Sequence, residues 1–102
     1  MEMILTGEPL PAERAFQLGL ISRLVAPGEA MNEARKLALQ ITACAPLAVY
    51  ASRKVVLAAA YQTDEELIDL TNQEFAKVMA SGDTKEGLTA FIEKRMPNWT
   101  GQ

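Results

Sequence analysis

Apolar residues recur at helical spacing through most of the second part of the chain. Between residues 29 and 45 they return every three or four positions, with charged residues elsewhere on the helical wheel, which predicts an amphipathic helix. Pro46 ends that helix and can open the next, because proline lacks the amide hydrogen that a helix interior needs. Residues 46–61 are apolar on nearly every side, so we expect them to form the most buried helix.

Two more helices are predicted towards the end of the chain. Thr63 or Asp64 is expected to cap the third helix, with acidic residues at 64–66 where the helix dipole favours negative charge. Gly82 is expected to end it, and residues 83–86 resemble a capping box that opens a last helix before Pro97. The inward face of the third helix is predicted to comprise Leu67, Ile68, Thr71, Phe75, Val78 and Met79.

The first 28 residues show a different pattern. Residues 1–6 are typical of the last turns of a helix that ends at Gly7, which indicates a chain that begins inside an element. A short helix is expected after Pro11, and residues 20–25 are the single strand candidate, which needs a partner. We therefore predict a mainly α fold with one short strand at its start, divided into residues 1–28 and a helical domain of residues 29–102.

Composition excludes several classes of partner. The 102 residues are 49% hydrophobic and 23% charged, which is ordinary for one soluble domain. A net charge of −3 gives no basic field for phosphate backbones, so we expect no nucleic-acid partner. No apolar run is long enough to suggest a membrane partner, and Glu2 stands where a signal peptide would be basic. The cytoplasm is the expected compartment.

Residue usage also excludes several chemistries. The chain has no histidine, which removes Ser-His-Asp and Cys-His catalysis and histidine-ligated zinc. Cys44 is the single cysteine, so no disulfide can form within the chain, and we expect it to be a small buried apolar residue. The carboxylates fall on predicted solvated faces and helix starts. We therefore assign no catalytic residue and no metal site.

Four segments in order along the chain resemble one family, and together they cover essentially all of it. The sequence is similar to the C-terminal part of the crotonase superfamily, the enoyl-CoA hydratases and isomerases. The first two segments contain residues 2–7, Pro11, Ala12, Ala15 and 19–21, then Leu37, Ala38, Ile41, Ala45, Pro46, Ala48 and Lys54. The last two contain residues 81–83, Glu86, Gly87, Ala90 and Phe91, then 93–95, Pro97, Trp99 and Gly101.

The resemblance implies that this segment is one part of a larger enzyme, with a role different from that of the catalytic part. Residues 1–28 would be the tail end of the family's spiral core, and residues 29–102 its C-terminal helical, oligomerising part. The oxyanion hole and catalytic carboxylates of the family belong to the spiral core that precedes this segment. This chain alone is therefore expected to be inactive. It would pack subunits into trimers or paired trimers and cover an acyl-CoA substrate, with no further cofactor.

Phe91 and Lys94 are the candidate binding residues. They stand at i and i+3, which on a helix places them on one face, where a ring can stack on adenine and a cation can meet a ribose phosphate. By resemblance, these positions contact the nucleotide end of coenzyme A. From the residues alone, Phe91 is a core residue and Lys94 a solvated charge. Trp99 is expected to anchor the tail, and the Lys54 amine to reach water.

Two alternatives stay open at this point. The apolar stripe of the third helix suits either a core within one chain or an interface between chains, because both need the same pattern. The chain as a whole is either part of a CoA-thioester enzyme or a stand-alone helical interaction module without enzymatic activity.

Overall fold

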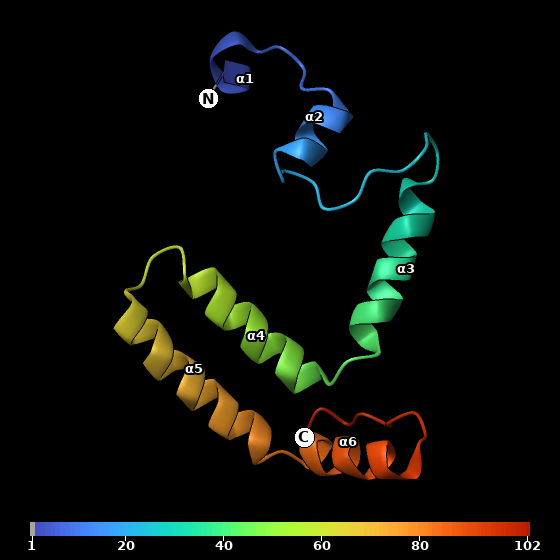
Figure 1. Cartoon of the computed structure of the whole chain (residues 1–102), viewed down its shortest axis with the longest axis vertical. Coiled ribbons are helices and arrows are strands. Elements are labelled where there is room, and N and C mark those ends of the chain that lie inside the picture. The colour runs from blue at the N-terminus through green and yellow to red at the C-terminus, as the bar shows by residue number, and fades with distance from the viewer. Residues whose placement is uncertain (1) are drawn as a thin grey trace. The chain divides into compact units, whose positions relative to one another are not determined.

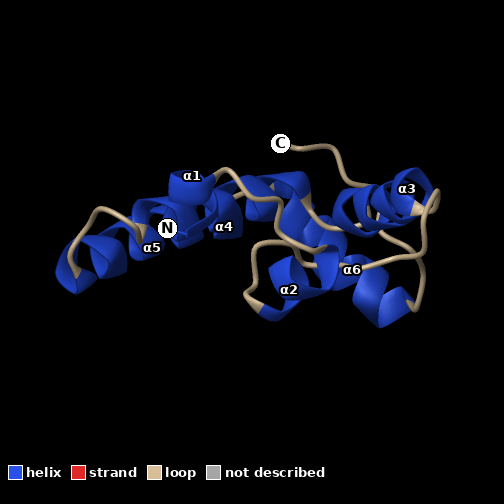
Figure 2. Cartoon of the chain, turned by 90° about the horizontal axis from the view of Figure 1, so that it is seen from above, coloured by secondary structure: helices blue, strands red, loops and turns tan. Residues whose placement is uncertain are grey.

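The computed structural model describes residues 2–102, and these form helices joined by loops, with no strand among them (Figure 2). They divide into two compact units, Met1–Lys36 and Leu37–Gln102. The mainly α fold is therefore confirmed, while the functional division at residue 28 stays a prediction. The helices are α1 (Glu2–Thr6), α2 (Ala12–Gln17), α3 (Ala30–Thr42), α4 (Pro46–Ala58), α5 (Asp64–Met79) and α6 (Gly82–Glu93).

The predicted helix end at Gly7 is confirmed. Gly7 has φ +72°, a left-handed conformation that glycine adopts without a steric penalty, and its N–H donates to the Met3 carbonyl at 3.0 Å. Further along this unit, Arg23 pairs with Glu33 of α3 and holds the pKa of that carboxyl below its ordinary value.

The predicted strand at residues 20–25 is wrong. These residues form bends and an irregular segment, and the Leu20 N–H donates to the Ala15 carbonyl at 2.9 Å, which closes the turn after α2. A strand is stabilised by a partner strand, and the part of the chain that the structure describes offers none. Local patterning alone therefore does not make this segment extended.

α4 and α5 lie side by side as a helical hairpin (Figure 1). Pro46 opens α4, and Thr63 caps α5 with a complete capping box, in which Thr63 and Glu66 each satisfy the other's backbone N–H. Both predicted helix starts are thus confirmed. The boundary before α6 differs, because α5 ends at Met79 and Ser81, rather than a residue after Gly82, caps α6.

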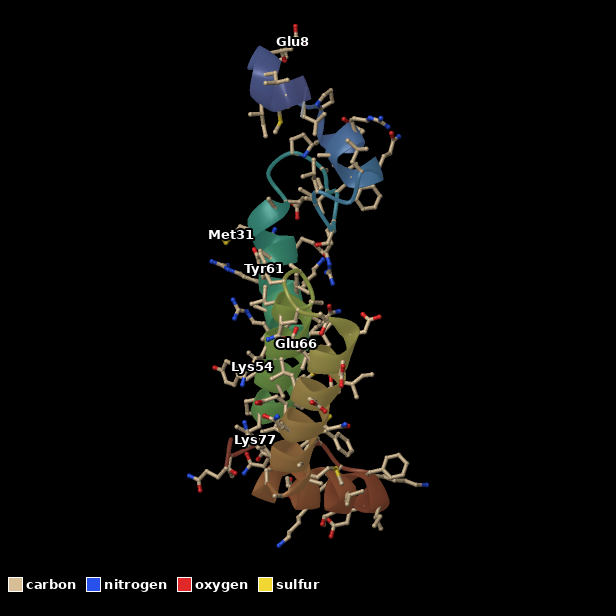
Figure 3. The ribbon with its side chains drawn as sticks, turned by 90° about the vertical axis from the view of Figure 1, so that its left-hand side faces the viewer. Glu8, Met31, Lys54, Tyr61, Glu66 and Lys77 are labelled. Atoms are coloured by element: carbon tan, nitrogen blue, oxygen red, sulfur yellow. The ribbon has the colours of Figure 1, made fainter. Side chains whose placement is uncertain are left out.

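Glu74 of α5 ties the hairpin together. Its Oε1 accepts hydrogen bonds from Lys54 Nζ of α4 at 2.8 Å and from Lys77 Nζ at 2.7 Å, and Figure 3 shows these two lysines on their helices. Both hydrogen bonds lower the pKa of Glu74, and the bond from Lys54 has the larger effect. The Lys54 side chain is 55% exposed, in line with the expectation that its amine reaches water, and its charge also has a carboxylate partner on the neighbouring helix.

The burial predictions are corrected as well. α4 is not the most buried helix: none of its residues is buried, and Tyr50 is 70% exposed. The buried residues among those described are Ser81, which caps α6, and Asp83 and Ala90 within that helix. The reason is geometric, because α5 is the one helix packed along α4 and covers only one of its apolar sides.

Two further predictions of burial, for the α5 face and for Cys44, are also wrong. On the predicted inward face of α5, Leu67 and Val78 are half-buried, while Ile68, Phe75 and Met79 are 61%, 63% and 51% exposed. Cys44 is exposed rather than buried. The α5 stripe therefore does not form a core within this chain.

Candidate functional site at the end of α6

Phe91 and Lys94 lie at the end of α6, but not on one helical face. α6 ends at Glu93, and Lys94 caps it in the left-handed conformation, with φ 53° and ψ 40°. The Lys94 N–H donates to the Phe91 carbonyl at 3.3 Å and the Arg95 N–H to the Ala90 carbonyl at 3.0 Å. These two bonds form a Schellman motif. The Lys94 side chain therefore projects from the residue just past the helix. The prediction that Phe91 and Lys94 share one helical face is wrong.

Both side chains are available to a ligand. Phe91 is 84% exposed, so it is not a core residue of this chain. Lys94 is exposed, and no hydrogen bond or ion pair holds its ammonium group within residues 2–102. Among the residues that the structure describes, Lys94 is also the only non-glycine residue with a positive φ. An aromatic face and an unpaired cation thus lie three residues apart on a conformationally costly turn.

Arg95, the next residue, is held by carboxylates instead. Its Nη1 and Nη2 donate to the two carboxylate oxygens of Glu86, at 2.6 and 3.0 Å, and its Nε donates to Glu93 at 2.6 Å. Glu86 also accepts the backbone N–H of Asn98 at 2.6 Å. The bonds from Arg95 and then Asn98 lower the pKa of Glu86 to about 2, while Glu86 and Glu93 raise the pKa of Arg95.

Asp83 fastens the tail that follows, a role that sequence analysis missed. Its carboxylate is 2% exposed and accepts the Thr100 N–H at 2.8 Å, the Thr100 hydroxyl at 3.1 Å and the Gly101 N–H at 3.0 Å. The Gln102 carbonyl in turn accepts the N–H groups of Gly82 and Asp83, at 2.6 and 3.3 Å. An acidic residue in the first turn of a helix signals only a dipole interaction, so nothing local predicts these partners.

Trp99 is the predicted tail anchor, and the structure confirms it. Its indole Nε1 donates to the Ala43 carbonyl at 2.8 Å. The ring lies against Gly87 of α6, where an added Cβ would come within 3.2 Å of the ring atom Cη2. Glycine at this helical position therefore lets the indole ring lie directly on the helix backbone. Residues 95–102 are thus held by Glu86, Gly87, Ala43 and Asp83 in turn.

Four of the described carboxyls have surroundings that favour the ionised form. Each carboxyl whose pKa departs from its ordinary value has it lowered, by cations or by backbone and hydroxyl donors, at Glu33, Glu66, Glu74 and Glu86. A general acid at neutral pH needs the opposite shift. Within residues 2–102 there is also no group of three or more Cys, Asp or Glu that could hold a metal ion.

No single helix in the described part of the chain is long and apolar enough to cross a bilayer, although α3 and α4 taken together as a bent pair meet the length and composition criteria.

Comparison with known proteins identifies the class. The sequence profile of the enoyl-CoA hydratase/isomerase family matches residues 1–102. The crystal structure of an enoyl-CoA hydratase from Mycobacterium tuberculosis superposes with a TM-score of 0.94 at 42% identity, covering 100% of this chain and 40% of that one. The helices are therefore a segment of the crotonase fold. The chain belongs to the enoyl-CoA hydratase/isomerase family.

Curated relatives match over nearly the whole chain. A carnitinyl-CoA dehydratase of Salmonella typhi is 36% identical over 105 residues, which cover 99% of this chain and 40% of that protein. A probable mitochondrial enoyl-CoA hydratase of Dictyostelium discoideum is 37% identical over 99 residues, which cover 97% of this chain and 36% of that protein. The chain thus spans about 40% of the length of the first of these relatives and slightly less of the second.

Proposed function

We propose that this chain is the C-terminal part of an enzyme that acts on acyl-CoA thioesters in fatty acid or acyl-CoA metabolism. The support is family membership, together with relatives named as a hydratase and a dehydratase of CoA thioesters. The complete enzyme would hydrate an enoyl-CoA, or run a sibling lyase or isomerase reaction. In this proposal, the oxyanion hole and catalytic carboxylates belong to the part of the family fold that this chain does not span.

The pair Phe91 and Lys94 is proposed to bind the nucleotide end of coenzyme A. One combination at the end of α6 carries this assignment. The Phe91 ring is 84% exposed, and the Lys94 ammonium group has no partner among the described residues. Adenine offers a flat face for stacking on Phe91, and the ribose phosphate offers a charge for Lys94. Arg95 is excluded from this role, because Glu86 and Glu93 already occupy its guanidinium.

The exposed apolar face of α5 is proposed to pack subunits together. Ile68, Phe75 and Met79 are each at least half exposed on one helix, and nothing within the described chain covers them. Side chains of this type are enriched at the centres of protein interfaces. By the resemblance described above, the assembly would be a trimer or a pair of trimers.

The expected cytoplasmic compartment is part of the same proposal, and fractionation of source cells tests it.

A comparison of two ligands tests the coenzyme A assignment. Coenzyme A and dephospho-CoA differ only in the ribose phosphate, so the ratio of their affinities isolates the contact made by that phosphate. Titrations of the isotope-labelled chain by NMR are expected to shift the amide signals of Phe91 and Lys94, with coenzyme A the tighter ligand. Lys94→Ala is expected to weaken coenzyme A about fivefold, the size of an exposed ion pair, and to leave dephospho-CoA nearly unchanged.

Lys85→Ala is the matched control, because Lys85 lies on the same helix near its opposite end. It is expected to leave both affinities unchanged. Equal weakening of the two ligands by Lys94→Ala would contradict the phosphate assignment. An absence of signal shifts at Phe91 and Lys94 at millimolar ligand would contradict the site as a whole and favour the helical interaction module.

A further inference from the structure

The two residues that follow each other at the end of α6 have opposite environments. Lys94 has no side-chain partner in the described chain, whereas Arg95 donates to Glu86 through two nitrogen atoms, at 2.6 and 3.0 Å. Because the residues are adjacent, fixing the Arg95 side chain restricts the backbone from which Lys94 projects. The fixed Arg95 side chain thereby limits the backbone conformations that Lys94 can adopt.

The backbone at Lys94 needs such support. A left-handed conformation is unfavourable for a residue with a Cβ, and it persists only where the surroundings impose it. The Schellman bonds are one constraint. The second is Glu86, whose carboxylate accepts from Arg95 and from the backbone N–H of Asn98 at 2.6 Å. Its donors therefore all come from residues 95–98, the segment directly after Lys94.

We propose that Glu86, acting through Arg95, is a positioning residue that fixes the direction of the Lys94 side chain relative to the Phe91 ring. This inference rests on the proposed function, because it assigns Glu86 to the same coenzyme A site. Glu86 does not touch the ligand. It ties the backbone after Lys94 to α6 at a position five residues before Phe91, so that ring and cation keep one mutual arrangement before the ligand arrives. Such preorganisation strengthens binding without a new contact.

Two substitutions test this role by different means. Glu86→Gln removes the charge and one of the acceptors that Arg95 uses. Arg95→Lys keeps a cation for Glu86 but loses the two-pronged geometry. Both are expected to lower the preference for coenzyme A over dephospho-CoA by roughly threefold to fivefold, while dephospho-CoA binding stays within about twofold. The scalar couplings of Lys94, which report its φ angle, are expected to move away from left-handed values in the ligand-free chain.

A double variant separates positioning from general stability. If Glu86 acts through Lys94, adding Glu86→Gln to Lys94→Ala costs no further preference, because the contact it positions is already gone. The matched control is Glu74→Gln, which removes a carboxylate with two lysine partners on the α4–α5 hairpin. It is expected to leave the preference unchanged.

The outcomes distinguish this inference from the function on which it rests. If Lys94→Ala leaves the ligand preference unchanged, the proposed function fails. If Lys94→Ala lowers the preference but Glu86→Gln and Arg95→Lys do not, only the positioning role is overturned. Equal weakening of both ligands by Glu86→Gln, or additive losses in the double variant, would likewise overturn it and leave Glu86 a purely structural residue.

Discussion

Lys94 occupies a backbone conformation that glycine adopts most readily. Helices commonly end in glycine at this position, because a Cβ there crowds the following carbonyl. The lysine contributes a cation near the negative end of the α6 dipole, but its ammonium group gains no partner within the described residues. Retention of a side chain at a cost in backbone energy is characteristic of a functional position.

Lys94→Gly separates the two contributions. Glycine relieves the left-handed strain, so we expect the free energy of unfolding to rise by up to about 1 kcal/mol. The same variant is expected to lose the preference for coenzyme A over dephospho-CoA. Denaturant unfolding followed by Trp99 fluorescence measures the first effect. Lys85→Gly, inside α6, is the control and is expected to cost about 1 kcal/mol. A destabilised Lys94→Gly would contradict the strain argument.

Glu86 gives the chain a defined sensitivity to acid. Its pKa lies near 2 in the fold, against an ordinary value of 4.5, so folding favours the ionised carboxylate. The stabilisation is therefore fully present above about pH 4.5 and is lost as the pH falls towards about 2. We expect the stability difference between the parent and Glu86→Gln to shrink over this range. A difference that stays constant with pH would mean that the Glu86 charge contributes nothing.

At the scale of the elements, the tail is held by groups far from it in sequence. The Asp83 carboxylate accepts the N–H groups of both Thr100 and Gly101, and the Trp99 indole reaches the Ala43 carbonyl. The Asp83 bonds satisfy backbone donors that have no partner in a helix or sheet, and the Trp99 bond satisfies a backbone acceptor. The end of α6 and the tail therefore form one structural piece, and the proposed binding residues Phe91 and Lys94 lie where the two meet.

Asp83→Ala is expected to release this piece. It leaves the Thr100 and Gly101 N–H groups without their acceptor, at a cost of about 2 kcal/mol. Hydrogen exchange at residues 99–102 is expected to accelerate, while exchange in α4 changes little. Asp69→Ala is the control, because Asp69 is exposed on α5 and makes no hydrogen bond within the described residues. Unchanged exchange in the Asp83 variant would show that the Asp83 carboxylate is not needed to hold the tail.

The sequence could predict helix starts, because these depend on neighbouring residues. It could not predict hydrogen bonds and ion pairs with residues far away along the chain. Pro46 and the pair Thr63 and Glu66 act within one turn, so their patterns are sufficient. The Glu74–Lys54 pair and the Asp83 bonds join residues 17 to 20 positions apart, which no local pattern encodes. The predicted strand failed for a related reason, because its hydrophobic pattern does not specify a partner.

At the scale of the whole molecule, apolar side chains outnumber the positions that can bury them. Ala90 is the only buried hydrophobic residue among those described, and large apolar residues on α4, α5 and α6 are exposed. A helical pattern predicts that a face is apolar but not which surface covers it, which is why the α5 stripe could equally have been a core. The relatives' greater length fits a fold in which further surfaces cover these faces.

We therefore expect the isolated chain to self-associate. Sedimentation is expected to give a mass above the 11.1 kDa of one chain. Phe75→Glu, at a position that is 63% exposed on α5, places a charge on the proposed interface and is expected to shift the equilibrium towards the monomer. Gln73→Glu, about 200° away around the same helix, is the control. A compact monomer that binds no apolar dye would contradict the proposed interface.

The most direct test of the account is the contact between coenzyme A and the end of α6. An isotope-filtered nuclear Overhauser experiment on the labelled chain with unlabelled coenzyme A reports which side chains approach the adenine protons. We expect cross-peaks from adenine to the Phe91 ring, and their loss in Phe91→Ala. Cross-peaks confined to other residues, or none at saturating ligand, would contradict the assignment of this segment to coenzyme A binding.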